Sequence, residues 1–376
     1  MATIRQHTAT LLVPTIFFGY ALYANSTLLI SSTATDAHAA ENKNLSLSYV
    51  IDGEATRDLD ALYKKELPHR EPSVGVFGNA RYAVLGAGRK GVVIGDDHWF
   101  FTTEEFKKVS QADISDAVER IDGIRKQLAE RGITLVVAPL PAKSDIYAEE
   151  LPGSLQSSAM ADAYEAFSSA LRDKGLTVAD TRTALVQAKP FDPVFLKSDT
   201  HWTPHGAKAT AAAIQSTLQA AGLTLPQQQV TAQWQTPVSI WGDLTRYVTS
   251  PEYAPAAGLT QENLPIYRTT AESPDAGADL FGDSAGAPVM LVGTSYSANE
   301  NWSFVDFLRE SLSTDVVNVA KEGLGPGVPM LDLLEGGVLD ESKPSVVVWE
   351  FPVRFLGTKT LWKRVTSEPE GGHHNA

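Results

Sequence analysis

The chain has 376 residues, of which 43% are hydrophobic, and this suits one large domain or two small ones. The formal net charge of −14 argues against a broad basic surface for nucleic acid, so any polyanion would need a local basic patch. Cysteine is absent, which excludes thiol catalysis, thiolate zinc sites and disulfides.

The N-terminal residues 1–40 predict export from the cytoplasm. Arg5 precedes an apolar run at 11–23, and no acidic residue occurs before Asp36. Residues 37–39 read Ala-His-Ala, which resembles a signal-peptidase cleavage site. We expect a periplasmic protein with either a cleaved signal peptide or a retained N-terminal membrane anchor, and the sequence leaves both open.

After a polar linker at 41–57, we expect one folded domain at 58–366 and a disordered tail at 367–376. A short helix is predicted at 59–67, and apolar runs on both sides of a tight turn predict a hairpin at 91–101. The remaining apolar patterns predict helices and strands in alternation: helix 114–132, strand 133–139, helix 161–174, strand 176–180, helix 204–221, strand 289–292, a helix through 302–308, and strands 316–319 and 346–349.

This alternation predicts an α/β fold with a doubly wound, mostly parallel sheet flanked by helices. The strands at 133–139 and 289–292 are continuous apolar runs, which is typical of strands buried on both faces. Residues 223–288 differ, because they are rich in Gln, Thr, Pro and Gly with scattered Trp and Tyr. We expect a loop-rich insertion there, and its aromatic residues suit either sugar stacking or the core.

Asp199 and His201 lie in a short polar stretch that leads into a helix. Thr203 can cap that helix and Pro204 suits its first position. In an extended loop, residues two apart point the same way, so the carboxylate and the imidazole would lie together. A carboxylate beside an imidazole is the orienting half of a catalytic triad, which then needs a nucleophile.

Two serines compete for the role of nucleophile. Ser284 follows Gly-Asp, but the residues around it predict a loop on both sides. Ser295 follows a buried strand and a glycine and precedes a helix, which is the geometry that presents a serine nucleophile. We therefore favour Ser295, although either serine could simply be a turn or capping residue.

A metal site is the alternative for this stretch, because Asp199, His201 and His205 could supply three ligands. We do not favour it, since no further run of ligands is evident, and we expect neither a metal nor another cofactor. His205 then has no catalytic part and lies in the first turn of the helix.

Residues 198–207 (Ser-Asp-Thr-His-Trp-Thr-Pro-His-Gly-Ala), taken with 293–297 (Gly-Thr-Ser-Tyr-Ser), resemble the AlgJ/AlgX family of alginate O-acetyltransferases. The likeness extends over about 62–356 and includes Trp-Glu-Phe-Pro at 349–352, which favours the AlgJ type. One residue departs from that type: His98 stands where a glycine is expected.

The resemblance implies an SGNH hydrolase-like fold and a triad of Ser295, His201 and Asp199. It implies an exported enzyme that moves acetyl groups onto a nascent exopolysaccharide, with the acetyl group supplied by a membrane-bound O-acyltransferase within a synthesis and secretion complex. Relatives acetylate cellulose, and the net negative charge of this chain would repel a polyuronate at long range, so alginate and cellulose both stay open.

Further site residues are expected around the triad. The oxyanion hole would use the N–H of Tyr296 or Ser295 and, as a second donor, Gly323, which could equally be a turn glycine. Substrate contacts are expected from Lys143, Arg354 and Trp202; the two cations could instead form ordinary salt bridges. A periplasmic acetylesterase and a non-catalytic polysaccharide-binding subunit are the competing functions.

Overall fold

The computed structural model describes residues 14–27, 56–57, 70–153, 155, 158–271 and 287–362. The chain divides into two units, Met1–Gly78 and Asn79–Ala376. Residues 14–27 are helical, and among the described residues no helix combines the length and apolar character that a membrane crossing requires. The expected cleavage site at 37–39, most of the linker, the helix at 59–67, Ser284 and the tail all lie outside the described residues.

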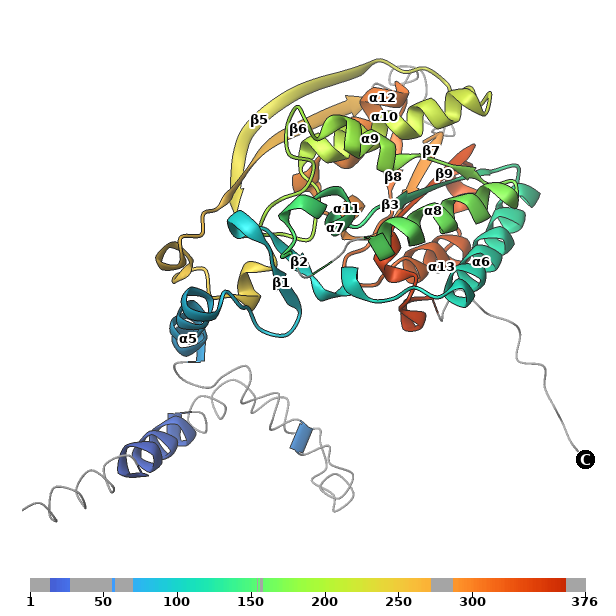
Figure 1. Ribbon diagram of the computed structural model, residues 1–376. Helices are drawn as coiled ribbons and strands as arrows, with labels where there is room; N and C mark the ends of the chain where they lie inside the picture. The colour runs from blue at the N-terminus through green and yellow to red at the C-terminus, as the bar shows by residue number, and fades with distance from the viewer. Residues whose placement is uncertain are drawn as a thin grey trace, which may run out of the picture. The chain divides into compact units, whose positions relative to one another are not determined.

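The second unit is built on a five-stranded sheet in the order β4-β3-β9-β7-β8, in which every pair is parallel (Figure 1). This confirms the predicted parallel α/β sheet. The strands are β3 (Thr134–Leu140), β4 (Thr177–Val178), β7 (Val289–Val292), β8 (Val316–Asn318) and β9 (Val346–Pro352). The helices are α5 (Arg70–Leu85), α6 (Gln111–Glu130), α7 (Lys143–Ile146), α8 (Ser158–Asp173), α9 (Thr181–Ala188), α10 (Pro204–Ala220), α11 (Ser295–Ala298), α12 (Phe304–Leu312), α13 (Gly327–Glu335) and α14 (Val338–Ser342).

Helices cover both faces of the sheet, because successive strand residues point to opposite sides. Val136 and Val348 join the core under α9, α10 and α12, whereas Val137 and Val347 join the core under α6, α8 and α13. In Figure 1 the two groups of helices lie on opposite sides of the strands. The continuous apolar runs predicted from the sequence are therefore buried on both faces.

The helix predicted through 302–308 is interrupted, which corrects that prediction. The chain forms α11, a 3-10 turn at Glu300–Trp302, and then α12. The break falls at Ser303, which has a φ of 53° and is fully buried. Its side-chain oxygen accepts the main-chain N–H of Tyr267 at 3.0 Å, so this tertiary contact compensates for the left-handed backbone.

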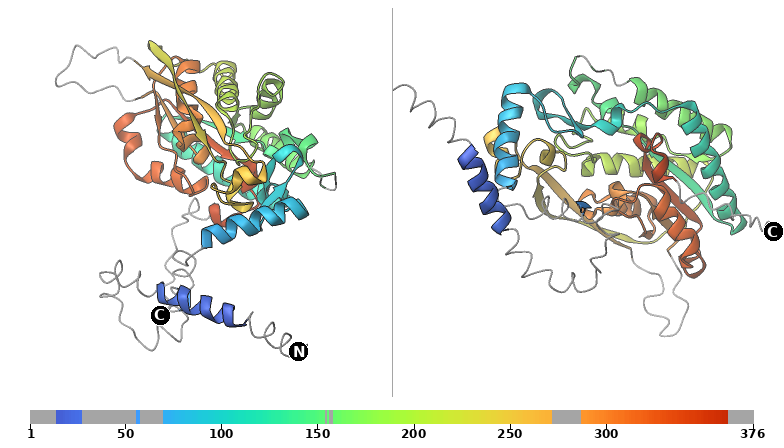
Figure 2. Two further views of the ribbon diagram at one scale, coloured as in Figure 1. Left: turned by 90° about the vertical axis from the view of Figure 1, so that its left-hand side faces the viewer. Right: turned by 90° about the horizontal axis from the view of Figure 1, so that it is seen from below.

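The segment expected to be loop-rich contains a long antiparallel ribbon of β5 (Val230–Ile240) and β6 (Glu262–Ala271). The sequence analysis missed it, although apolar residues alternate with other residues at 230, 232, 234, 238 and 240, because the segment is rich in Gln, Thr and Pro; most of β5 is also exposed. Figures 1 and 2 show the ribbon beside the helical layer, and β6 packs against α12.

The predicted hairpin is confirmed as β1 (Val92–Ile94) paired with β2 (Phe100–Thr102). Its connection is a 3-10 turn in which Asp97 and His98 have φ of 45° and 63°. A left-handed backbone explains why a glycine is expected at 98. Here the imidazole Nδ1 lies 2.6 Å from the Tyr82 hydroxyl, and this hydrogen bond offsets part of the strain.

Gly206 in the first turn of α10 leaves no room for a side chain, since a Cβ there would lie 2.2 Å from the Val194 carbonyl oxygen. We expect Gly206→Ala to lower the free energy of unfolding by about 2 kcal/mol, because backbone must move. Urea denaturation measures this. The control is Gly123→Ala within α6, where a Cβ has no neighbour within 4 Å; it should raise stability by up to about 1 kcal/mol. Equal effects of the two substitutions would contradict this account.

Candidate active site

Ser295, His201 and Asp199 form one chain of hydrogen bonds. His201 Nε2 lies 2.7 Å from Ser295 Oγ, and His201 Nδ1 lies 2.6 Å from Asp199 Oδ1. The serine begins α11 directly after β7, whereas the other two residues lie on the loop that leads into α10. The expected meeting of the two segments is therefore present, at the carboxyl end of a parallel strand where α/β proteins form their sites.

The loop that carries Asp199 and His201 is fixed at its C-terminal end by the N-cap of α10. Thr203 Oγ1 accepts the Gly206 N–H at 3.1 Å, and Pro204 occupies the first helical position, as predicted. An isolated bridge pairs Phe195 with Trp202 across the loop. The loop is thus closed at its base, and Asp199 and His201 lie at its tip.

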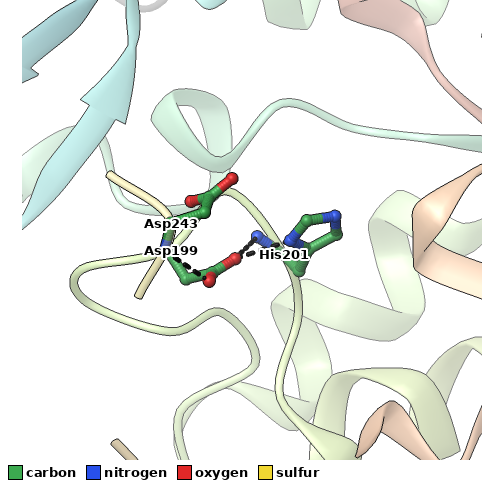
Figure 3. A group of neighbouring side chains, drawn as sticks. All are labelled: Asp199, His201 and Asp243. Carbon is green, nitrogen blue, oxygen red and sulfur yellow. Dashed lines mark hydrogen bonds and ion pairs between the residues drawn. The ribbon is translucent and has the colours of Figure 1, made fainter. Parts of the chain in front are cut away.

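Asp199 is 3% exposed, and its carboxylate accepts several N–H groups. Oδ1 accepts the main-chain N–H of His201 at 2.9 Å, and Oδ2 accepts that of Asp243 at 2.8 Å (Figure 3). Burial raises the pKa of Asp199, but the hydrogen bonds and charge of His201 outweigh it and leave this pKa below its ordinary value. The carboxylate is therefore ionised at neutral pH and holds the proton of His201 on Nδ1, which leaves Nε2 to accept.

Two aromatic rings fix the plane of the His201 imidazole. Trp302 stacks on it with ring centroids 5.1 Å apart and an interplanar angle of 22°, and Tyr296 lies at 4.7 Å. The Trp302 indole N–H also donates to the Ser295 carbonyl oxygen at 3.1 Å. One residue thus contacts both the imidazole and the backbone that carries the serine.

A buried carboxylate from the neighbouring strand holds the turn that presents Ser295. Glu350 on β9 is fully buried and accepts the Thr294 N–H at 3.0 Å and the Ser297 hydroxyl at 2.7 Å. A Cβ at Gly293 would lie 2.5 Å from Glu350 Oε2, so the turn requires glycine. Burial raises the pKa of Glu350 despite these hydrogen bonds.

Lys143 holds the loop that carries Asp199 and His201 from within the core. Its side chain is 1% exposed, and its ammonium donates to the carbonyl oxygens of Phe100, Lys197 and Asp199 at 2.6, 2.8 and 3.0 Å. Burial lowers the pKa of Lys143 to about 8, even though nearby carboxylates such as Glu105 oppose the shift. All three N–H groups are occupied, which argues against the predicted substrate contact and corrects it to a positioning role.

Burial also argues against direct substrate contacts for Trp202 and Arg354, contrary to the sequence prediction. Trp202 is fully buried and packs against Phe304 with ring centroids 4.6 Å apart. Arg354 is 5% exposed and donates to the Tyr296 hydroxyl at 2.9 Å, and that hydroxyl in turn donates to the Thr200 carbonyl. Both side chains therefore lie in the core beneath the loop that carries Asp199 and His201.

The two predicted oxyanion donors differ in their surroundings. Ser295 and Tyr296 open α11, so their N–H groups have no preceding helical carbonyl; that of Tyr296 only reaches Thr294 Oγ1 at 3.5 Å. Gly323 has a φ of 73° and lies in the loop after β8, where a Cβ would meet no atom within 4 Å. Both donors stay predictions.

The structure gathers a different set of possible metal ligands from the set that the sequence suggested. His205 lies apart from the cluster, because its Nε2 is 3.1 Å from the Ala188 carbonyl oxygen. The acidic and imidazole groups that do gather are those of Asp199, His201 and Asp243, with ligand atoms within 4.8 Å of one another. The hydrogen bonds described above already use both Asp199 oxygens and His201 Nδ1, which leaves little donor capacity for a cation.

Asp243, Trp302 and Glu350 are site residues that the sequence analysis did not identify. Asp243 lies in a stretch without any motif, and Trp302 reaches the imidazole only because the helix after Ser295 is broken. Glu350 had a signal, since its Trp-Glu-Phe-Pro motif was noted for the family resemblance. Its carboxylate at the end of an apolar strand could have indicated a buried hydrogen-bonding role.

The parallel sheet and the hydrogen-bonded serine at a strand end are those of an SGNH hydrolase-like domain. The family model described as "SGNH hydrolase-like domain, acetyltransferase AlgX" matches residues 92–353. The chain is 36% identical over 318 residues to the "Probable alginate O-acetylase AlgJ" of Azotobacter vinelandii, covering 82% of this chain and 80% of that relative. This chain therefore belongs to the AlgJ/AlgX family of SGNH hydrolase-like acetyltransferases.

Other relatives agree with this assignment. The corresponding "Probable alginate O-acetylase AlgJ" of Pseudomonas aeruginosa is 36% identical over 323 residues, covering 82% of this chain and 81% of the relative. The solved O-acetyltransferase domain of Pseudomonas putida AlgJ superposes with a TM-score of 0.63 at 34% identity, covering 72% of this chain and 93% of that one. Pseudomonas aeruginosa AlgX shares the fold, with a TM-score of 0.58 at 23% identity over 73% of this chain and 65% of that one.

Proposed function

We propose that the protein is a periplasmic O-acetyltransferase that acetylates hydroxyl groups of an exopolysaccharide of the alginate type through an acetyl-serine intermediate. The observation that carries the proposal is the hydrogen-bonded series Ser295–His201–Asp199 in a chain that is 36% identical to proteins named as alginate O-acetylases. The acetyl group is supplied by a membrane-bound O-acyltransferase, and the acceptor arrives from a synthesis and secretion complex.

In the first step, His201 Nε2 takes the proton of Ser295 Oγ while this oxygen attacks the acetyl carbonyl carbon. The bond between the acetyl group and the donor breaks, and His201 returns its proton to the departing donor atom. Asp199 stabilises the imidazolium that exists between these transfers. The N–H groups at the start of α11 stabilise the tetrahedral oxyanion.

In the second step, a sugar hydroxyl gives its proton to His201 and attacks the acetyl-serine carbonyl carbon. The bond to Ser295 Oγ breaks, and this oxygen recovers a proton from His201. Water could take the place of the sugar, so transferase and esterase share the same groups. Selectivity for the acceptor must come from residues that bind sugar outside the hydrogen-bonded series.

The test is an acceptor panel with an activated acetyl ester as donor. We expect acetylated oligomannuronate by mass spectrometry, formed faster than acetate is released in the absence of acceptor. Acetylation of cello-oligosaccharides alone would instead establish a cellulose-type acceptor. Acetate release that no acceptor reduces would contradict the transferase proposal and leave a carbohydrate acetylesterase.

A further inference from the structure

A cavity of about 420 Å³ lies beside the catalytic loop, outside the hydrogen-bonded series. Residues 195–197 and 203–205, which flank the tip that carries Asp199 and His201, form one wall. The ribbon strands β5 and β6 and helix α12 form the others through Trp234, Glu262 and Phe307. The size of the cavity suits one or two sugar rings. The ribbon and α12, which contribute no residue to the hydrogen-bonded series, form part of its wall.

Trp234 gives the cavity an exposed aromatic surface. Its side chain is 59% exposed, although its ring packs on Tyr267 with centroids 4.7 Å apart. Tyr267 stacks in turn on Phe307 at 5.0 Å and 12°, and its hydroxyl donates to Glu310. The indole is thus supported by ordered aromatic rings while much of its surface stays in solvent, which is the arrangement of a stacking platform rather than of a core residue.

Lys208 is the cation of the cavity that remains available for a ligand. The Lys197 ammonium is neutralised by Asp97 at 2.5 Å, and Glu262 is occupied by the N–H and hydroxyl of Ser198. The Lys208 ammonium lies 5.8 Å from the Phe307 ring centroid, and within the described ranges it has no ion-pair partner. An exposed ammonium beside an aromatic surface fits a sugar that carries a carboxylate.

We propose that this cavity is an accessory binding site for a uronate unit of the acceptor polysaccharide, with Trp234 stacking on the pyranose ring and Lys208 contacting its carboxylate. The identity of the polymer rests on the proposed function, whereas the binding site does not. Because the cavity wall and His201 share one loop, a chain held here would be retained close to the loop that resolves the acetyl-serine.

The experiment measures binding of oligomannuronate and of a cello-oligosaccharide of equal length by calorimetry. We expect Trp234→Ala to weaken oligomannuronate binding about tenfold and Trp234→Phe to keep most of it, since phenylalanine retains a stacking surface. Lys208→Gln should weaken oligomannuronate about fivefold and leave the neutral sugar unchanged. Lys126→Gln on α6, which is 64% exposed, is the matched control and should change neither. The melting temperature of each variant is compared with that of the wild type, and an unchanged value shows that a loss of binding does not come from misfolding.

Equal binding by Trp234→Ala and the wild type would overturn the site, as would equal losses in the alanine and phenylalanine variants. Equal losses for both sugars in Lys208→Gln would overturn the carboxylate contact. Ser295→Ala should lose acetyl transfer but keep binding. Oligomannuronate binding by a wild-type protein that shows no transferase activity would instead refute the proposed function and leave the accessory site standing.

Discussion

Ser295→Ala is expected to lower kcat for acetyl transfer by at least about 10³-fold, because it removes the atom that carries the acetyl group. The hydroxyl lies 2.7 Å from His201 Nε2, so it is placed to give its proton to this base. The alanine variant should also fail to form the acetyl-enzyme that peptide mass spectrometry detects on Ser295 in the wild type after a short exposure to an activated ester. Folding should be unaffected, since the side chain is not part of the core.

The matched control is Ser284→Ala, which removes the competing serine of the Gly-Asp-Ser motif. Its kcat should stay within about twofold of the wild type, as expected for a residue outside the chemistry. The assignment of the nucleophile fails if Ser295→Ala keeps full activity, and it reverses if the acetyl group is found on Ser284.

Asp199→Asn is the second large effect, and we expect kcat to fall by about 10²- to 10⁴-fold. An amide can donate a hydrogen bond to His201 Nδ1 and so favours the tautomer with its proton on Nε2, which can no longer accept from Ser295. Because the pKa of Asp199 lies below its ordinary value, its charge is present throughout the range from pH 5 to 9. The loss should therefore be similar at every pH in this range, and the pH–rate profile measures it.

Asp243→Asn serves as the comparison for this variant. Its main-chain N–H, which donates to Asp199 Oδ2, is retained in the asparagine variant, and only the side-chain contacts to Thr200 change. We expect a loss of about tenfold or less. A loss in Asp243→Asn as large as in Asp199→Asn would show that the two carboxylates act as one unit, contrary to the expectation that only the Asp199 carboxylate orients His201.

Local patterns were sufficient for the elements of the sheet. The strand at 289–292 coincides with its predicted apolar run, and the strand at 134–140 overlaps the run predicted at 133–139, because burial on both faces demands such runs. The start of α10 was also predicted correctly, since Thr203 caps the helix and Pro204 suits its first position without any contact from elsewhere in the chain. These features depend on neighbours in sequence.

The sequence analysis missed the ribbon β5–β6 and the break at Ser303, for different reasons. β5 does carry apolar residues at strand period, at 230, 232, 234, 238 and 240, but its Gln- and Thr-rich composition and Pro237 favoured a loop, and only its pairing with β6 shows it to be a strand. The left-handed backbone at Ser303 is compensated by Tyr267, which lies 36 residues away. At Ser303 the contact that decides the conformation is remote in the chain, and periodicity carries no record of it.

In the candidate site, too, some residues could be predicted from local sequence and others only from the tertiary structure. Asp199, His201 and Ser295 were found from the sequence because each stands in a local context, a loop before a helix or a turn after a strand, that presents its side chain. Only the tertiary structure assigned Lys143 and Trp202 to the supporting core, since burial depends on what packs around a residue. Only the tertiary structure showed that Asp243, Trp302 and Glu350 lie around Ser295 and His201. It also showed that Trp234 and Lys208 line one cavity. Local sequence patterns do not record which separate elements come close in space.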